Sequence, residues 1–166
     1  MRKLLRFVLM LTLLPAAASL ARATLITPLS LEEMTDQAHW IGVGTCTSVS
    51  SAWQGKQIWT DAVFKVERSV KGAPSTELHL RQLGGRVSQP VPVAMRVAGV
   101  HDFLLGEIDL LFLDQDPGGA RRVLGLMQGR IPLRRDASGE LRGPDGEKLE
   151  SILARVEARL KAGAKP

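Results

Sequence analysis

Residues 40–70 read WIGVGTCTSVSSAWQGKQIWTDAVFKVERSV. Residues 40–50 and 57–70 of this stretch are predicted to form two long β-strands. The polar bend between them, residues 51–56, contains Gly55, which can take the positive φ angle of a tight turn. In the second strand, side chains alternate with a period of two, as expected of a strand with one buried face. The stretch therefore predicts a β-hairpin.

The length of these strands predicts a curved sheet. A strand of about a dozen residues spans roughly 40 Å, whereas most strands have about five or six residues. Long strands usually coil, and Gly42 and Gly44 are positions at which the first one can bend. We therefore expect a mainly β chain, with a small antiparallel barrel that begins from this hairpin.

The first 23 residues have the order of a secretory signal peptide. A basic start is followed by an apolar run over residues 7–20 and by Ala-Arg-Ala at residues 21–23. Cleavage is expected before Thr24. A transmembrane anchor is the alternative, but a span needs about 20 apolar residues, and this run is shorter and contains Pro15. We expect an exported protein, periplasmic or extracellular, with no stable membrane span after cleavage.

The charge balance changes when that segment is removed. The full chain has 22 basic and 17 acidic residues, a formal net charge of +5. Four of the basic residues lie in residues 1–23, so residues 24–166 keep 18 basic and 17 acidic residues. A nearly neutral domain lacks the basic stripe that binds nucleic acid, so no nucleic-acid partner is expected. The remaining length suits a single domain.

Later segments complete the predicted sheet. Residues 77–83 alternate as a third strand. Residues 108–113 end in four consecutive apolar residues, a pattern that indicates burial on both faces. Residues 121–128 and 130–135 are predicted to be further strands.

The segment from residue 85 to residue 101 is the least regular part of the sequence. Pro90 and Pro92 exclude a central strand there, although residues 94–97 could form a short edge strand. A loop this long in a compact domain is either functional or partly disordered.

Two helices are predicted, one near each end of the domain. Ser30 and Glu33 form a capping box at the start of a short N-terminal helix. Residues 147–162 carry an apolar stripe at helical spacing, which predicts an amphipathic C-terminal helix. We expect this helix to cover one face of residues 108–113, and binding of a partner by its apolar face is the alternative.

The sequence carries no motif for catalysis, for a metal or for a cofactor. The three histidines, His39, His79 and His101, stand far apart, and there is no Cys-x-x-Cys or His-x-x-x-His pair. No Gly-x-Ser-x-Gly motif occurs. The single cysteine, Cys46, lies in mid-strand and is expected to be a small buried residue. We therefore expect no enzymatic activity, no metal and no cofactor.

Aromatic and basic residues of the hairpin, the third strand and the long loop are the candidate binding residues. Trp53 lies in the predicted bend, where a core position is difficult. Trp59 lies on the polar face of its strand, and packing under a helix is the alternative for it. Such residues on a barrel rim make a plausible contact surface. The set consists of Trp53, Trp59, Arg81, Arg86, Arg96 and His101.

Five motifs follow one another along the chain: LSLEE at residues 29–33, WIGVGT at 40–45, FxVExxxKG at 64–72, a Gly-Gly pair at 84–85 and GExxLLFL at 106–113. Their order resembles a group of uncharacterised exported bacterial proteins with an OB-like β-barrel. The resemblance covers roughly residues 29–135. It implies an OB-like antiparallel barrel with a short N-terminal helix and a C-terminal amphipathic helix, in one domain, and it transfers no catalytic residue.

A weaker similarity in layout links the helix and barrel to the inhibitory domain of tissue inhibitors of metalloproteinases. Those inhibitors rely on an N-terminal cysteine, and this chain has Thr24 at that position. The expected function is a non-enzymatic binding module of the bacterial envelope that recognises a protein, peptide or glycan through loops at the barrel rim. The alternatives are an inhibitor of an extracellular hydrolase that uses the loop at 85–101, and a small hydrolase in which carboxylates and a histidine meet in a pocket.

Overall fold

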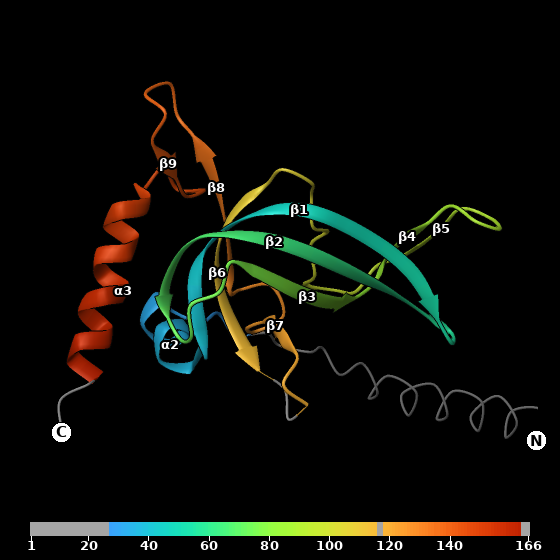
Figure 1. Ribbon diagram of the computed structural model, residues 1–166, viewed down its shortest axis with the longest axis horizontal. Coiled ribbons are helices and arrows are strands. Elements are labelled where there is room, and N and C mark those ends of the chain that lie inside the picture. The colour runs from blue at the N-terminus through green and yellow to red at the C-terminus, as the bar shows by residue number, and fades with distance from the viewer. Residues whose placement is uncertain (1–26, 116–117, 164–166) are drawn as a thin grey trace, which may run out of the picture.

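The computed structural model of the protein describes residues 27–115 and 118–163. The expected signal peptide, residues 1–23, lies outside the described residues and stays a prediction. The described chain is mainly β, with a short helix near the N-terminal end and a longer helix near the C-terminal end (Figure 1). Within it, no helix is long and apolar enough to cross a membrane.

The predicted hairpin is present and is longer than expected. Strand β1 (Trp40–Gln54) pairs antiparallel with β2 (Gln57–Lys71), and Gly55 takes a φ of 60° in the short turn between them. The ladder continues through most of the predicted bend at residues 51–56, so Trp53 lies in a strand and not in a loop. Three register shifts interrupt the ladder, and such irregularities increase the twist of a long hairpin.

The other strands flank this hairpin on both sides. Strand β3 (Glu77–Leu83) has the predicted bounds and pairs with β2. The other edge of β1 pairs with β6 (Ile108–Gln115), which is followed in the sheet by β8 (Arg130–Arg135) and β9 (Leu141–Arg142). Strand β7 (Arg121–Val123) pairs with the end of β6. All of these pairings are antiparallel.

The irregular segment between residues 85 and 101 is an ordered hairpin. Strands β4 (Gly85–Val87) and β5 (Val93–Met95) form a separate two-stranded sheet. In Figure 1 this hairpin projects from the body of the protein, on the same side as the end of the β1–β2 hairpin. Strand β5 begins one residue earlier and ends two residues earlier than the predicted edge strand at 94–97, and it pairs within the segment itself.

The expected antiparallel barrel, closed or nearly closed, is not formed, because the sheet does not close. The strand order is β3-β2-β1-β6-β8-β9, which leaves β3 as an edge of the sheet. The predicted strand at 121–128 stops at Val123, because the chain then turns at Gly125 and Leu126, whose φ angles are 58° and 68°. Strand β7 therefore ends without pairing with β3, and the sheet curls without closing. We call the unpaired boundary between β3 and β7 the seam.

Strand β6 separates two apolar clusters. Leu110 and Phe112 belong to the cluster beneath the helices, and Leu111 and Leu113 belong to the cluster inside the curled sheet. All four side chains are completely buried. The predicted burial of this strand on both faces is confirmed.

The helices form the cover that β6 requires. Helix α2 (Leu31–Gln37) starts with the predicted capping box of Ser30 and Glu33. Helix α3 (Leu149–Gly163) begins two residues later than predicted and buries its apolar stripe in the same cluster as Leu110 and Phe112. Exposed ion pairs, such as that of Arg159 with Asp36, join α3 to α2. The cover role expected for this helix is confirmed.

Truncation of the α3 stripe tests this cover. Leu153 is 1% exposed, so Leu153→Ala should lower the free energy of unfolding by about 2–5 kcal/mol through lost burial and a residual cavity. The control is Ser151→Ala, an exposed position in the same helix, which should change it by less than about 0.5 kcal/mol. Urea unfolding measures both, and equal effects would show that α3 does not cover the sheet.

Candidate functional site

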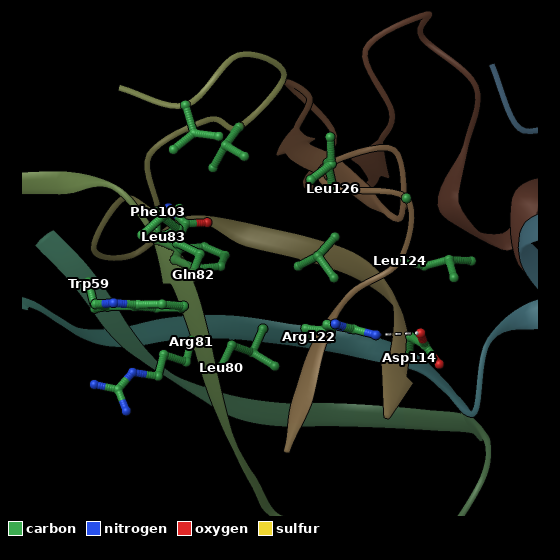
Figure 2. Close-up of a pocket in the computed structure, with 14 residues that line it drawn as sticks. Trp59, Leu80, Arg81, Gln82, Leu83, Phe103, Asp114, Arg122, Leu124 and Leu126 are labelled. Carbon is green, nitrogen blue, oxygen red and sulfur yellow. Dashed lines mark hydrogen bonds and ion pairs between the residues drawn. The ribbon is translucent and has the colours of Figure 1, made fainter. Parts of the chain in front are cut away.

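A pocket of about 370 Å³ opens along the seam (Figure 2). Its walls come from β3 on one side and from the end of β7 and the following turn on the other, and the loop before β6 completes it. The lining is mostly apolar, as is usual for a preformed binding pocket. We call it the seam pocket. Its apolar lining includes Leu80, Val97, Val100, Phe103, Val123 and Leu126.

The β3 wall presents an apolar residue to the seam and a cation to its outer margin. In Figure 2 Leu80 points toward β7, whereas Arg81 points the other way, beside Trp59. The guanidinium carbon of Arg81 lies 5.4 Å from the centroid of the Trp59 ring, within cation–π range. The Nε atom of Arg81 is also 3.3 Å from a carboxylate oxygen of Asp61. Trp59 is thus already stacked against a neighbour.

The β7 wall combines a second cation with a strained turn. An Nη atom of Arg122 lies 3.5 Å from the carboxylate of Asp114 (Figure 2). The backbone N–H of Gln115, followed by the charges of Arg122 and His39, lowers the pKa of Asp114. Leu126 has a positive φ of 68° and is 51% exposed. A branched side chain rarely adopts that conformation, and strain of this kind often marks functional segments.

A smaller pocket of about 200 Å³ adjoins the seam pocket, and the two share the end of β3. Arg96 and His101 line this smaller pocket. The side-chain amide of Gln82 lies between the two pockets and donates a hydrogen bond of 3.3 Å to the carbonyl oxygen of His101. Its own oxygen is buried and accepts no hydrogen bond from the described residues.

The structure brings four of the six predicted binding residues to one region. Trp59 and Arg81 line the seam pocket, and Arg96 and His101 line its neighbour. Trp59 therefore lies on the margin of a pocket that the sequence did not predict, and its role in binding stays a prediction.

Trp53 and Arg86 lie elsewhere. Trp53 is near the end of the long hairpin and is 44% exposed, in line with the expected exposure. Arg86 is in β4, where it pairs with Asp102 at 3.4 Å. The six predicted binding residues therefore do not form one surface, and Trp53 and Arg86 do not contribute to the seam pocket.

Several lining residues were missed by the sequence analysis. Phe103 is 4% exposed and packs edge to face on Phe64, with ring centroids 5.5 Å apart, so it had the pattern of a core residue. Leu126 was assigned to a strand. The Gly125-Leu126 pair was the available signal, because a glycine within a predicted strand often marks an interruption.

A buried charge cluster lies close to the pocket, against Phe103. Arg130 is its centre, with Nε donating to Asp109 at 2.8 Å and an Nη atom donating to Glu107. Its other Nη atom donates to the carbonyl oxygen of Asp102 at 3.0 Å. The guanidinium carbon lies 5.1 Å from the ring centroid of Phe103. These contacts tie β8 to β6 and to the loop before it.

This cluster bears on the hydrolase alternative. His101, Glu107 and Arg130 line a cavity of about 530 Å³, so a histidine and a carboxylate do share one cavity. However, Arg130 binds Glu107 and Asp109 together, and Asp109 is completely buried. Burial raises the pKa of Asp109 to about 6, against the opposing effect of Arg130. The arrangement of Arg130, Glu107 and Asp109 is that of a structural ion pair, and Asp102, which also lines the cavity, pairs with Arg86.

Neither a nucleophile nor a metal site stands out among the described residues. Cys46 is 1% exposed, and burial raises the pKa of its thiol, so the thiolate that would react is disfavoured. No group of three or more His, Cys, Asp or Glu residues in residues 27–115 and 118–163 is arranged to hold a metal ion.

No protein-family model matches this chain, and no curated protein sequence matches it. The resemblance to exported OB-like proteins therefore stays a hypothesis, and the geometry of the seam carries the functional argument.

The buried carboxyl group of Asp109 should make the stability of the protein depend on pH. The folded pKa of Asp109, about 6, lies above its ordinary value of 3.8, so the folded chain holds this proton more tightly than the unfolded chain does. The contribution of this group to stability is therefore present below about pH 4 and is lost as the pH rises through about 6. Relative to Asp109→Asn, the wild-type protein should lose on the order of 1–3 kcal/mol between about pH 4 and 7.

Urea unfolding of the two proteins at several pH values checks this expectation. A stability difference that stays constant with pH, or that changes in favour of the wild type as the pH rises, would contradict the assignment.

Proposed function

We propose that this protein is an exported, non-enzymatic binding module of the bacterial envelope, and that it holds an apolar side chain of a protein or peptide partner in the seam pocket. The observation that carries the proposal is the pocket itself, which is open, mostly apolar and built on the edge of a sheet. A rigid concave site of this kind needs little reorganisation to bind, which favours affinity. The signal-like residues 1–23 support the exported location.

The charges at the margin favour a partner with a carboxylate beside its apolar side chain. Arg81 and Arg122 flank the pocket, and their ion pairs with Asp61 and Asp114 are long and exposed. Exposed pairs contribute little, so the guanidinium of Arg122 can turn to an acidic group on a partner at small cost, whereas Arg81 is also held by its stacking on Trp59.

A protein or peptide fits this site better than a glycan. Sugars usually stack on a free aromatic face, and Arg81 already lies over the ring of Trp59. The apolar walls instead suit side chains of the Leu, Ile or Phe type.

The projecting hairpin supports the inhibitor as a second candidate. An inhibitor needs an ordered, exposed loop to insert into an enzyme, and β4–β5 projects with Val91 63% exposed and Val93 38% exposed (Figure 1). On this alternative, the contact surface is the hairpin and the seam pocket has no role.

One capture experiment separates the two candidates. The full chain with a C-terminal tag is expressed in a bacterium, recovered from the periplasm and medium, and its bound proteins are identified. Leu126→Ala should weaken capture of the main partner about tenfold, because it removes an exposed apolar contact from the pocket wall. Val91→Ala, in the hairpin, is the matched control and should leave capture unchanged.

Loss of partner capture with Val91→Ala and not with Leu126→Ala would show that the partner binds the β4–β5 hairpin and not the seam pocket. That result would favour the inhibitor. Retention of the partner by both variants would rule out both surfaces. Recovery of the tagged chain from the cytoplasm with residues 1–23 still attached would contradict the exported location.

A further inference from the structure

The far half of β1 has a free edge. On this edge β1 pairs with β6 from Trp40 to Thr45, and the pairing ends where the backbone of Cys46 bonds to Glu107 and Gly106 at 2.8 and 2.7 Å. Beyond that point the edge of β1 has no strand partner among the described residues, and in Figure 1 it runs out to the hairpin turn. The backbone N–H and C=O groups of alternate residues, those that point away from β2, are thus available to another strand, while β4 packs on the concave face of β1 near Ser51.

The sequence of this edge lacks the features that usually prevent strand pairing. Residues 47–54 read TSVSSAWQ, with no charged residue and no proline. Natural proteins commonly protect an exposed edge with Lys, Pro or a cover. An uncharged strand can also pair with a copy of itself without like-charge repulsion.

Two exposed apolar side chains are placed symmetrically along this edge. Val49 and Trp53 lie on one face of the hairpin, the concave one, because they stand opposite the buried residues Ala62 and Ile58. They are 36% and 44% exposed, and Ser51 lies midway between them. An antiparallel pairing of two copies centred on Ser51 therefore places Val49 of each copy opposite Trp53 of the other.

In this pairing, the indole ring of Trp53 from the second copy lies next to a pocket. A cavity of about 350 Å³ adjoins the concave face of β1, with Val49, Phe103 and Leu104 in its lining. Leu104 is 59% exposed, so its side chain has unfilled apolar surface. A tryptophan from a second copy, held above Val49, covers this cavity and the exposed face of Leu104.

The length of the free edge fits the same register. Pairing about Ser51 sets Gln54 of one copy opposite Ser48 of the other, and the turn at Gly55 then follows at once. The incoming strand thus ends just before Cys46, where β1 returns to its own partner, β6. We infer that the protein forms a two-fold dimer through the free edges of β1, paired antiparallel about Ser51, with each Trp53 packed on Val49 and Leu104 of the other copy.

The dimer pairs strands at β1 and leaves the β7 wall of the seam pocket uncovered, although Gln82 and Phe103 line both cavities. The observations that carry the dimer differ from those that carry the proposed function, and the dimer gives Trp53 a role that the seam pocket does not.

Cysteine cross-linking tests the register. The Ser51 hydroxyl is half-buried and bonds to Thr60 at 2.8 Å, and rotation about χ1 turns a thiol at this position toward the free edge. Ser51→Cys then brings the two new thiols together across the two-fold axis, at a Cα separation that allows a disulfide, so a mild oxidant should convert the protein to a covalent dimer. Ala52→Cys is the matched control, because residue 52 faces residue 50 of the other copy and should cross-link far less. The wild type, with its buried Cys46, gives the background.

Sedimentation of the unmodified full chain tests the dimer without cross-linking. We expect twice the monomer mass, and Trp53→Ala should raise the dimer dissociation constant at least about tenfold. Lys65→Ala, an exposed β2 residue away from the free edge, should leave it unchanged. Thermal unfolding at a concentration that dissociates the dimer confirms that each variant folds.

A monomer at every concentration, together with cross-linking of Ser51→Cys no greater than background, would overturn the inference. A dimer that cross-links through Ala52→Cys more than through Ser51→Cys, or that is unaffected by Trp53→Ala, would overturn the proposed pairing.

Discussion

Burial of β6 on both faces is the constraint on which the rest of the structure depends. Consecutive residues of a strand point to opposite faces of the sheet, so the four apolar residues Leu110 to Leu113 place apolar side chains on both faces. Neither face of β6 can therefore be exposed to solvent, and each needs its own cover. The curled β1–β2–β3 sheet covers one side, and the helices cover the other. The position of β6 next to β1 therefore fixes where the long hairpin and α3 must lie.

The same constraint explains why an open seam is tolerated. The interior cluster holds Phe64, Leu78 and Phe103 together with Leu111 and Leu113, so the curled sheet is stabilised by packing and does not need closure by hydrogen bonds. The turn at Gly125 and Leu126 then takes the chain away from β3. What remains between β3 and β7 is an apolar pocket with basic residues at its margin, and this is the region to which the proposed function is assigned.

The fold was largely predictable, because its determinants are local patterns. The alternation in residues 57–70, the capping box at Ser30 and the apolar stripe of α3 are each visible in the sequence, and each element was found close to its predicted bounds. The failure of the barrel to close was harder to predict. It depends on the left-handed backbone of Leu126, a conformation that a leucine rarely adopts, and the only sequence signal for it was the preceding Gly125.

The candidate site was only partly predictable for a related reason. Trp59 and Arg81 could be identified because an aromatic residue on the polar face of its strand, together with basic residues, is typical of a contact surface. The pocket that they border is formed by residues such as Phe103 and Leu80, which read as core residues in any sequence pattern. Their participation follows from the failure of β7 to meet β3, a tertiary feature that residue spacing does not encode.

Amide hydrogen exchange on β3, resolved by NMR, tests the open seam most directly. An edge strand has alternate N–H groups that face away from its only neighbour, so alternate amides of β3 (Glu77–Leu83) should exchange rapidly, whereas those of the central strand β6 should be protected throughout the ladder. Uniform protection along β3, equal to that of β6, would mean that the sheet closes on itself and that the seam pocket does not exist.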